Sequence, residues 1–308
     1  MQKEFLNAIY EIAQKDKNVL WLSADNGNDF DMFYYRDFPK QYFNMGIAEE
    51  NMIGVAAGLA SYGKNPFVYS AGTFLAYRTF EFIRDDICFQ KKNVKVVGFG
   101  SGISISMLGP THHSTEDIAL LRTLPNLTIL SPASPKEVYK CVHAAYEIKS
   151  PVYIRLEMSN EPEIYSGNCD FQLGKNNIIC EGSDIAVFST GSIISEVIIA
   201  AKKLKECGIS VEIVNVHTIK PFDKNSVLKE AAKVKYIFVV EEHTIIGGLG
   251  GLIAEIIADE NININFKRIG LNNCFAKGYG TISDVRKENG LNADSIFETI
   301  HNSLKEEK

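Results

Sequence analysis

Apolar residues fall into short continuous runs that alternate with segments of helical periodicity. In the first half of the chain, helical patterns lie at 48–62, about 74–90, 115–123 and 135–148. Runs rich in Val, Ile, Leu and aromatic residues lie around them at 18–25, 66–71, 93–100, 127–132 and 151–156. Continuous apolar strands that alternate with helices are typical of a parallel sheet covered on both faces. This half therefore predicts an α/β domain.

The alternation lapses after residue 159 and then resumes. The stretch SNEPEIYSGNCDFQLGK (159–175) is polar, rich in turn-forming residues and without either period. Beyond it, strand patterns occupy 184–190, 210–216, 236–242 and 264–271, with helical patterns at 192–207, 224–233 and 248–259. Because single cores rarely exceed ~250 residues, we predict two α/β domains, each with a mostly parallel sheet, at 1–165 and 181–308, joined by a linker at 166–180.

Charge and cysteine usage narrow the class of protein. The 308 residues carry a formal net charge of −6 and no stripe of Lys or Arg, which argues against a nucleic-acid surface. The six cysteines are scattered without a CxxC pair, as in a reducing cytoplasm. The N-terminus reads as an amphipathic helix, and no apolar run approaches the ~20 residues that cross a bilayer. We expect a cytoplasmic protein with small-molecule substrates and no membrane contact.

The stretch GIAEENMIGVAAGLASYG (46–63) places two adjacent carboxylates at the head of a small and apolar helix. If Gly63 stops this helix, Glu49 shares its packed face with Ile53 and Ala56, whereas Glu50 lies about 100° round the helix. Two acids in a first turn can simply complement the helix dipole. A carboxylate on a packed face, however, needs a partner. We therefore interpret Glu49 as a buried acid that awaits a ligand.

Aromatic residues follow the next strand at three-residue steps. Phe74, Tyr77 and Phe80 lie in SAGTFLAYRTFEF (70–82), directly after the strand that follows the Glu49 helix. Aromatic residues at this spacing usually belong to the hydrophobic core. Next to Glu49 they also suit a planar heteroaromatic ring, which could stack on an aromatic face while an edge nitrogen meets the carboxylate.

A loop with two adjacent histidines supplies the third candidate feature. In GPTHHSTED (109–117), we expect Ser114 or Thr115 to cap a helix whose first turn carries acidic residues. His112 and His113 are thereby held above the sheet edge where α/β proteins bind ligands, and we favour His112 as the functional one. The preceding glycines at 98, 100 and 102 do not form a dinucleotide-binding fingerprint.

Together these segments resemble the C-terminal half of transketolase, and most closely the separately encoded C-terminal subunits of split transketolases. GIAEEN with AAGLA matches the segment of the cofactor-activating glutamate, and GPTH matches the substrate-loop histidine. VNVHTIKPFD (214–223) and EEHTIIGGLGG (241–251) match signatures of the family's C-terminal domain. The resemblance spans nearly the whole chain.

The resemblance implies a thiamine diphosphate enzyme that transfers a two-carbon ketol unit from a ketose donor. Glu49 would hydrogen-bond the aminopyrimidine ring of the cofactor and favour its imino tautomer. Phe74, Tyr77 and Phe80 would form the platform for this ring, and Asp25 in LSADNG would contact the cofactor too. His112 would hydrogen-bond a substrate oxygen.

The resemblance also implies a second polypeptide. The family holds the cofactor's diphosphate and its Mg²⁺ (or Ca²⁺) with a GDG motif and a later Asn in another domain, and this sequence contains no GDG. We therefore expect an N-terminal transketolase subunit that carries the diphosphate-binding domain, in an α2β2 assembly. We assign no metal ligand to the present chain.

Three departures from the family pattern bear on the acceptor. Leu108 stands where the family usually has an Asp that reads a sugar hydroxyl, Met158 stands where it has a phosphate-contacting Arg, and Gly100 stands where it has a phosphate-contacting His. Charge-assisted contacts of this kind are the strongest in such sites. Their loss suggests an atypical acceptor.

Two other interpretations stay open at this point. The β subunit of a 2-oxoacid dehydrogenase shares the two-domain layout and also supplies a cofactor glutamate. A non-catalytic scaffold subunit would explain the three departures as erosion of the site. We expect the C-terminal domain to be mainly structural, with His217, His243 and the GGLGG glycines serving turns and helix starts.

Overall fold

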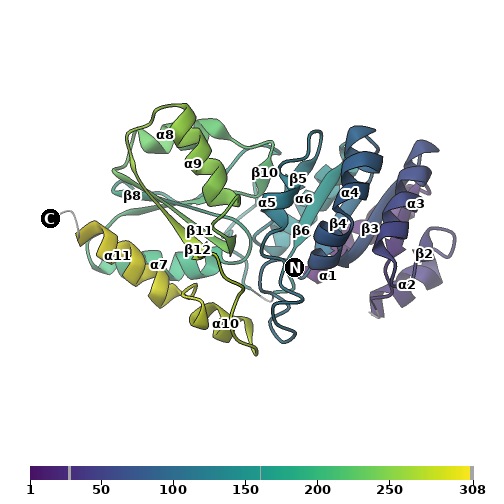
Figure 1. Ribbon diagram of the computed structural model, residues 1–308, viewed down its shortest axis with the longest axis horizontal. Coiled ribbons are helices and arrows are strands. Elements are labelled where there is room, and N and C mark those ends of the chain that lie inside the picture. The colour runs from purple at the N-terminus through teal and green to yellow at the C-terminus, as the bar shows by residue number, and fades with distance from the viewer. Residues whose placement is uncertain (27–28, 160, 306–308) are drawn as a thin grey trace.

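Two α/β domains lie side by side in the computed structural model, which describes residues 1–26, 29–159 and 161–305 (Figure 1). Each domain is built on one mostly parallel sheet with helices on both faces, which confirms the predicted fold class. No helix in these ranges is long and apolar enough to pass through a bilayer.

The first sheet has the strand order β10-β5-β6-β4-β3-β1-β2. All neighbours pair in parallel except β10, which comes from the second half of the chain and runs antiparallel to β5. The strands are β1 (Val19–Ser23), β2 (Tyr42–Asn44), β3 (Asn65–Ala71), β4 (Lys95–Phe99), β5 (Thr128–Leu130), β6 (Val152–Leu156) and β10 (Thr218–Lys220).

Helices cover both faces of this sheet. One face packs against α1 (Gln2–Lys15) and α6 (Pro135–Glu147) through a core that includes Trp21 and Tyr69. The other face packs against α3 (Glu49–Ser61), α5 (Asp117–Leu121) and a segment in which the short helix α4 (Phe80–Phe82) joins two π-helical stretches. These stretches are η1 (Phe74–Arg78) and η2 (Ile83–Phe89), and α2 (Asp29–Asp37) precedes the edge strand β2.

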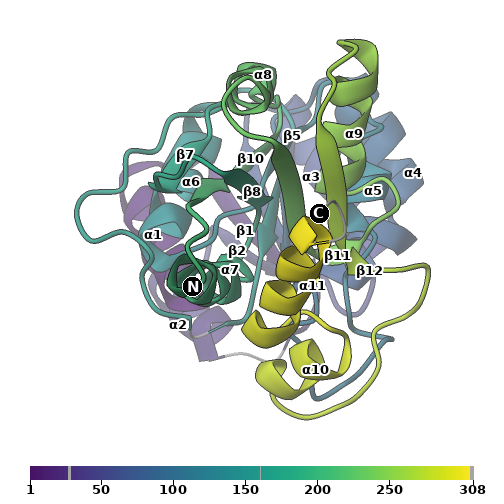
Figure 2. The same cartoon turned by 90° about the vertical axis from the view of Figure 1, so that its left-hand side faces the viewer.

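The second sheet has the order β12-β11-β8-β9-β7, and only β7 is antiparallel to its neighbour. Figure 2 shows helices on both of its faces. The strands are β7 (Asn177–Cys180), β8 (Ile185–Ser189), β9 (Val211–Asn215), β11 (Tyr236–Thr244) and β12 (Asn265–Leu271). The helices are α7 (Ile194–Glu206), α8 (Lys224–Ala231), α9 (Leu249–Asp259), α10 (Ile282–Glu288) and α11 (Ala293–Lys305).

The strands and helices that the sequence pattern predicts are present with ends shifted by a few residues, except that the helix expected at about 74–90 is π-helical over most of its length. Within the described residues, the elements that the pattern did not predict are three short edge strands (β2, β7 and β10) and three helices (α2, α10 and α11). Strand β7 begins at Asn177, inside the segment where we place the linker, and β10 joins the sheet of the first domain. The two halves of the chain thus share one sheet.

A buried cation joins the domains at the carboxyl end of β6. The guanidinium of Arg155 is almost fully buried and pairs with Asp117 at 3.1 Å and with Glu157 at 3.1 Å. It also donates to the backbone carbonyls of Ser114 and Glu242, the latter on β11 of the second domain. The loop before α5 is therefore held by the sheet and by the C-terminal domain together.

A second buried arginine continues this contact. Arg286 of α10 pairs with Glu242 at 2.5 Å and with Glu161 at 2.5 Å, and it donates to the Ser192 hydroxyl at 2.9 Å. Buried charges are tolerated only when they are paired in this way. The junction is consequently a connected ionic network and has little freedom to slide.

The stability of the fold depends on pH through His217, which lies just before β10. Its imidazole is fully buried, lies against Phe171 with ring centroids 4.3 Å apart, and Nδ1 is 2.9 Å from the Thr218 hydroxyl. Burial lowers the pKa of His217 to about 4. An unfolded histidine titrates near ~6.5. Between these values the unfolded chain binds a proton that the folded chain does not, so stability falls as pH falls from about 6.5 to 4.

We expect the titration of His217 to lower the free energy of unfolding by about 2 kcal/mol when the pH falls from 7 to 5. The measurement is the free energy of unfolding at both pH values for the wild type and for His217→Gln, which does not titrate. The variant should lose less stability on acidification, while a control, His301→Gln on α11, should behave as the wild type does. Equal losses in wild type and His217→Gln would contradict the prediction.

Candidate functional site

Glu49 opens α3 and is buried, as the helix pattern predicts. Its side chain is 1% exposed, and Ile53 and Ala56 on the same face are also buried. The helix stops where the sequence indicates: Gly63 adopts φ +78°, and its N–H donates to the carbonyl of Ala60. This left-handed conformation favours glycine. The local sequence therefore sets the C-terminal end of the helix that carries Glu49, whereas Ala48 at its start makes no side-chain cap.

The two carboxylate oxygens of Glu49 have different partners. Oε1 accepts a hydrogen bond from the Ser70 hydroxyl at the end of β3, at 3.2 Å. Oε2 accepts from the Arg78 guanidinium at 2.8 Å. The Arg78 side chain is 43% exposed, whereas Glu49 is enclosed. The carboxylate thus has one fixed neutral donor and one charged donor on the solvent side.

The LSADNG segment reaches this network through Asn26. Its amide donates to the carbonyl of Tyr69 at 2.9 Å, and its Oδ1 lies 3.4 Å from the Ser70 hydroxyl. Asp25, the predicted cofactor contact, is exposed at φ +55° and accepts from Asn44 Nδ2 at 2.9 Å. Asn26 therefore lies closer in the hydrogen-bond network to Glu49 than Asp25 does.

Phe74 and His112 extend the site from Glu49. The guanidinium carbon of Arg78 lies over the Phe74 ring, 5.0 Å from its centroid. His112 meets the same ring edge-on, with centroids 5.4 Å apart and an interplanar angle of 69°. Glu49, Arg78, Phe74 and His112 therefore form one contiguous cluster built from three segments of the chain.

Tyr77 and Phe80 make other contacts. The Tyr77 hydroxyl donates to Glu116 Oε2 at 2.6 Å and accepts from the Glu116 backbone N–H at 3.0 Å. Burial raises the pKa of Tyr77, so the phenol keeps its proton. Phe80 is partly buried against the core under α3. In the π-helical turn η1, the Arg78 guanidinium lies over the Phe74 ring. Sequence reasoning missed this arginine, although two residues four positions apart share a helix face.

The two histidines of the loop differ sharply. His112 is partly exposed, and its Nδ1 lies 3.0 Å from the Thr111 hydroxyl. His113 is 3% exposed, and neither ring nitrogen has a hydrogen-bond partner among the described residues. Burial lowers the pKa of His113 and keeps it neutral. Of the pair, His112 is the one presented to the cluster around Phe74.

The predicted helix cap at Ser114 or Thr115 is wrong. The backbone of Ser114 exchanges two hydrogen bonds with Gly102, at 2.9 and 3.0 Å, and α5 begins after Glu116 without a side-chain cap. Asp117 turns inward to Arg155 and to the Tyr153 hydroxyl. A contact between distant segments has replaced the local cap, and it fixes the loop that carries His112.

The three family departures lie around this loop. Leu108 is 53% exposed and Met158 is 41% exposed, so both present apolar surface. Gly100 has φ +72°, and a Cβ there would lie 2.1 Å from Ile105 Cδ1. The side chain of Ile105 fills the space that a residue at 100 would need. The loop also touches the second domain, because a Cβ on Gly109 would lie 2.2 Å from Tyr279 Cε1.

These residues fit one half of thiamine diphosphate. A buried carboxylate beside an aromatic face suits the aminopyrimidine ring, which offers N–H donors on its edge and a flat π-surface. The sequence has no GDG motif for the diphosphate, and the described residues contain no group of three or more His, Cys, Asp or Glu that could hold a metal ion.

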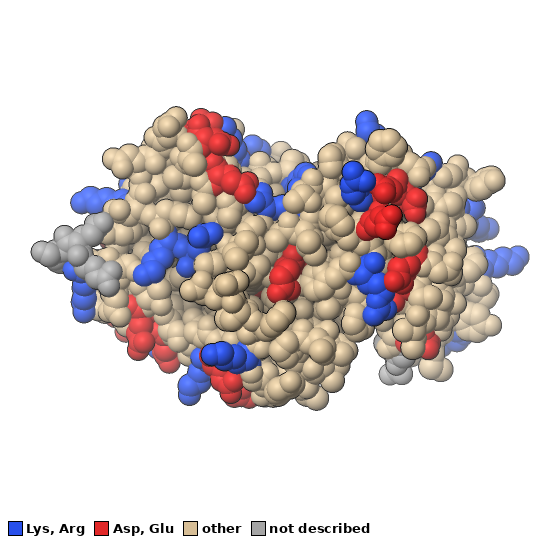
Figure 3. Space-filling model, viewed as in Figure 1, with Lys and Arg blue, Asp and Glu red and all other residues tan. Residues whose placement is uncertain are grey.

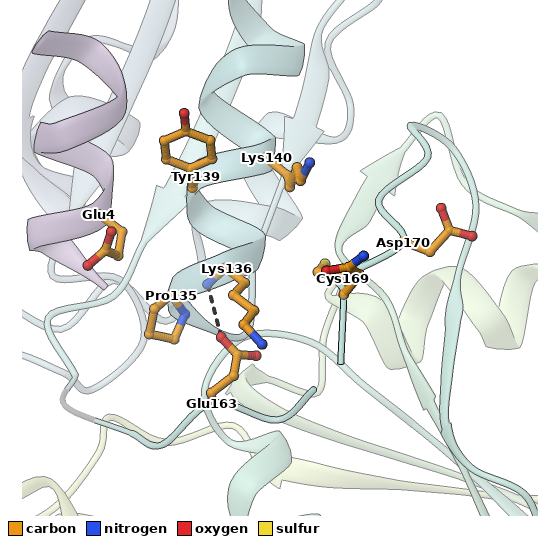
Figure 4. A pocket seen from close by; sticks show the side chains of 9 residues that line it. Glu4, Pro135, Lys136, Tyr139, Lys140, Glu163, Cys169 and Asp170 are labelled. Atoms are coloured by element: carbon orange, nitrogen blue, oxygen red, sulfur yellow. Dashed lines mark hydrogen bonds between the residues drawn. The ribbon is translucent and has the colours of Figure 1, made fainter. Parts of the chain in front are cut away.

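A cavity of about 870 Å³ lies elsewhere, between α1, the start of α6 and residues 163–170 (Figure 4). Glu163 caps α6 there by accepting from the Lys136 N–H at 3.0 Å. None of the predicted site residues lines this cavity. We therefore do not regard it as the active site.

Surface charge is mixed on the face shown in Figure 3. Lysine and arginine side chains alternate with acidic ones over both domains, and no broad positive area forms on this face. This distribution agrees with the net charge of −6 and favours small-molecule ligands over a polyanion.

Comparison with known proteins points to one family. A sequence profile of the transketolase pyrimidine-binding domain matches residues 1–162, and one of the transketolase C-terminal domain matches residues 174–296. A putative transketolase C-terminal section from Methanocaldococcus jannaschii is 36% identical over 310 residues, covering 100% of this chain and 97% of that protein.

Two further similarities concern proteins described as a transketolase subunit and a split-gene transketolase. The 6-deoxy-6-sulfo-D-fructose transketolase subunit SqwH of Clostridium sp. (strain MSTE9) is 34% identical over 302 residues, which is 98% of this chain and 93% of that one. A solved structure described as a split-gene transketolase, inactive β4 tetramer, superposes with a TM-score of 0.89 at 33% identity, covering 99% of this chain and 97% of that chain.

The close packing of Ile105 on Gly100 gives a test of the loop. Gly100→Ala should lower the free energy of unfolding by ~1–2 kcal/mol for the left-handed backbone and by a further ~1–3 kcal/mol for the clash. The matched control is Gly63→Ala, which has φ +78° and no atom within 4 Å of an added Cβ, so that only backbone strain contributes. Denaturant titration measures both variants, and equal losses would contradict the packing.

Proposed function

Because the chain belongs to the transketolase family, we propose that it is the C-terminal subunit of a two-chain enzyme that depends on thiamine diphosphate and transfers a two-carbon ketol unit. The donor would be a ketose and the acceptor an aldehyde or ketone. The observation that carries this proposal is Glu49, a buried carboxylate that pairs with the partly exposed Arg78, whose guanidinium lies over Phe74. The relatives that are named as transketolase subunits support it.

Glu49 is the proton-handling group in this proposal. When bound, thiamine diphosphate supplies a carbon nucleophile that cleaves and rebuilds ketoses. The task of Glu49 is to share a proton with the aminopyrimidine ring, which a carboxylate does well when little water competes for it. Ser70 holds Oε1 at 3.2 Å and thereby orients Oε2 toward the ring site.

Neighbouring side chains would position the ring and the substrate. Phe74 offers the aromatic face next to Glu49, while Tyr77 and Phe80 support the same segment from behind. Asp25 would reach the cofactor from the β1 end of the sheet. His112, edge-on to Phe74, would hydrogen-bond a substrate hydroxyl or carbonyl oxygen.

The missing half of the site requires a partner chain in this proposal. An N-terminal transketolase subunit would hold the diphosphate and Mg²⁺ (or Ca²⁺) with its GDG motif, in an α2β2 assembly. The cofactor would then be clamped between the two polypeptides, with the pyrimidine end against Glu49. A 2-oxoacid dehydrogenase would instead decarboxylate its substrate and need a lipoyl partner, which assays on the reconstituted complex distinguish.

The acceptor would be atypical. Exposed Leu108 and Met158 offer no donor for a sugar hydroxyl or a phosphate, and Ile105 fills the space beside Gly100. We propose an acceptor without a terminal phosphate at that point, or one with an apolar or deoxygenated carbon near Leu108. A nucleotide-linked keto sugar is one candidate.

Replacement of Glu49 tests the catalytic proposal. In the complex with the partner subunit, Glu49→Gln should lower the rate of ketol transfer at least ~100-fold, since it removes the proton acceptor, while folding and assembly persist. The matched control is Glu50→Gln, which changes the neighbouring, partly exposed acid and should keep the rate. An unchanged rate for Glu49→Gln would favour the non-catalytic scaffold.

Acceptor competition tests the role of Leu108. We expect poor turnover of xylulose 5-phosphate with ribose 5-phosphate by the wild-type complex. Leu108→Asp should lower the KM for polyhydroxylated acceptors about tenfold, because it restores a charged hydrogen-bond acceptor for a sugar hydroxyl. Efficient turnover of xylulose 5-phosphate with ribose 5-phosphate by the wild type would contradict the proposal of an atypical acceptor.

A further inference from the structure

The guanidinium of Arg78 makes the two contacts that the proposed function requires of an aminopyrimidine ring. It donates to Glu49 Oε2 at 2.8 Å, and its carbon lies over the Phe74 ring, 5.0 Å from the centroid. Both groups are planar, carry N–H donors on their edges and stack on aromatic faces. The same carboxylate oxygen and the same ring face therefore serve both.

We propose that Arg78 is a placeholder for the aminopyrimidine ring, and this rests on the proposed function. In the chain without cofactor it pairs with Glu49 and covers Phe74. On cofactor binding the guanidinium leaves Oε2 and moves toward solvent. A carboxylate oxygen that is occupied by a guanidinium donor cannot accept the ring N–H in the same position, so the two partners exclude each other.

The burial of the two partners shows which of them moves. Glu49 is 1% exposed and hydrogen-bonded by Ser70 in the sheet, so it stays. Arg78 is the last residue of the π-helical turn η1, its side chain is 43% exposed, and no hydrogen bond other than the one to Glu49 is found for it among the described residues. Half-exposed ion pairs and cation–π contacts are weak and exchange easily.

The buried carboxylate explains why a placeholder is useful. A carboxylate enclosed in protein carries a desolvation cost, which a charged partner partly offsets. Arg78 supplies that partner until the cofactor replaces it, so that the folded subunit can wait for assembly with Glu49 in position. Removal of Arg78 should therefore destabilise the chain without cofactor. It should also remove the group that competes with the cofactor for Glu49.

The experiment measures cofactor affinity in the complex of this chain with its GDG-bearing partner. Arg78→Met keeps the length of the side chain and removes the charge. We expect its dissociation constant for thiamine diphosphate, in the presence of Mg²⁺, to fall about three- to tenfold relative to wild type. The matched control is Arg84→Met, since Arg84 pairs with exposed Asp85 on η2 and should leave the constant unchanged.

A second measurement uses the isolated chain. Arg78→Met should lower its midpoint of thermal unfolding, and Arg78→Met with Glu49→Gln should recover most of the loss, because the amide needs no charged partner. Unchanged or weaker cofactor binding by Arg78→Met, with wild-type binding intact, would overturn the placeholder and make Arg78 a spectator or a cofactor ligand. A wild-type complex that binds no thiamine diphosphate would overturn the proposed function, and the placeholder with it.

Discussion

The buried guanidinium of Arg155 is the contact on which the geometry of the candidate site depends. It sits at the carboxyl end of β6, between Asp117 of α5 and Glu157, and it reaches the carbonyl of Glu242 in the second domain. Breaking a buried pair of this kind costs ~3–5 kcal/mol, although the intact pair adds little net stability. The main effect of Arg155 is therefore to fix positions. It fixes where the loop with His112 stands relative to the sheet that carries Glu49.

The pair between Arg78 and Glu49 has the opposite character. Arg155 and its partners Asp117 and Glu157 are all enclosed, so no other ligand can reach them. In the pair at the site only the carboxylate is enclosed, while the arginine faces solvent. The Arg155 network cannot exchange its partners, and it fixes the positions of the elements that it joins. The Arg78–Glu49 pair can exchange one partner, and it lies where a ligand is expected. The distinction follows from burial alone.

Sequence patterns predicted the frame and the central acid. Continuous apolar runs located the main strands, and the 3.6-residue period placed Glu49 inward. The three-residue strand β10 has no apolar run of its own, and it pairs with a strand of the other domain. The contact of Arg78 with Glu49 joins two segments that are 29 residues apart, so that local spacing gives no sign of it. Arg155 gave no local signal, because it stands within an apolar strand pattern and meets partners that are distant in sequence.

The C-terminal domain is more than a structural appendage to this site. The Thr244 N–H at the end of β11 donates to the carbonyl of Thr115, and the His243 ring accepts from the Ala119 N–H at the start of α5. Tyr279 packs on Gly109, the residue after Leu108. The histidine loop is thus held by the first domain on one side and by the second on the other. The second domain therefore fixes the position of the loop that carries Leu108 and His112, although none of its residues belongs to the cluster around Glu49.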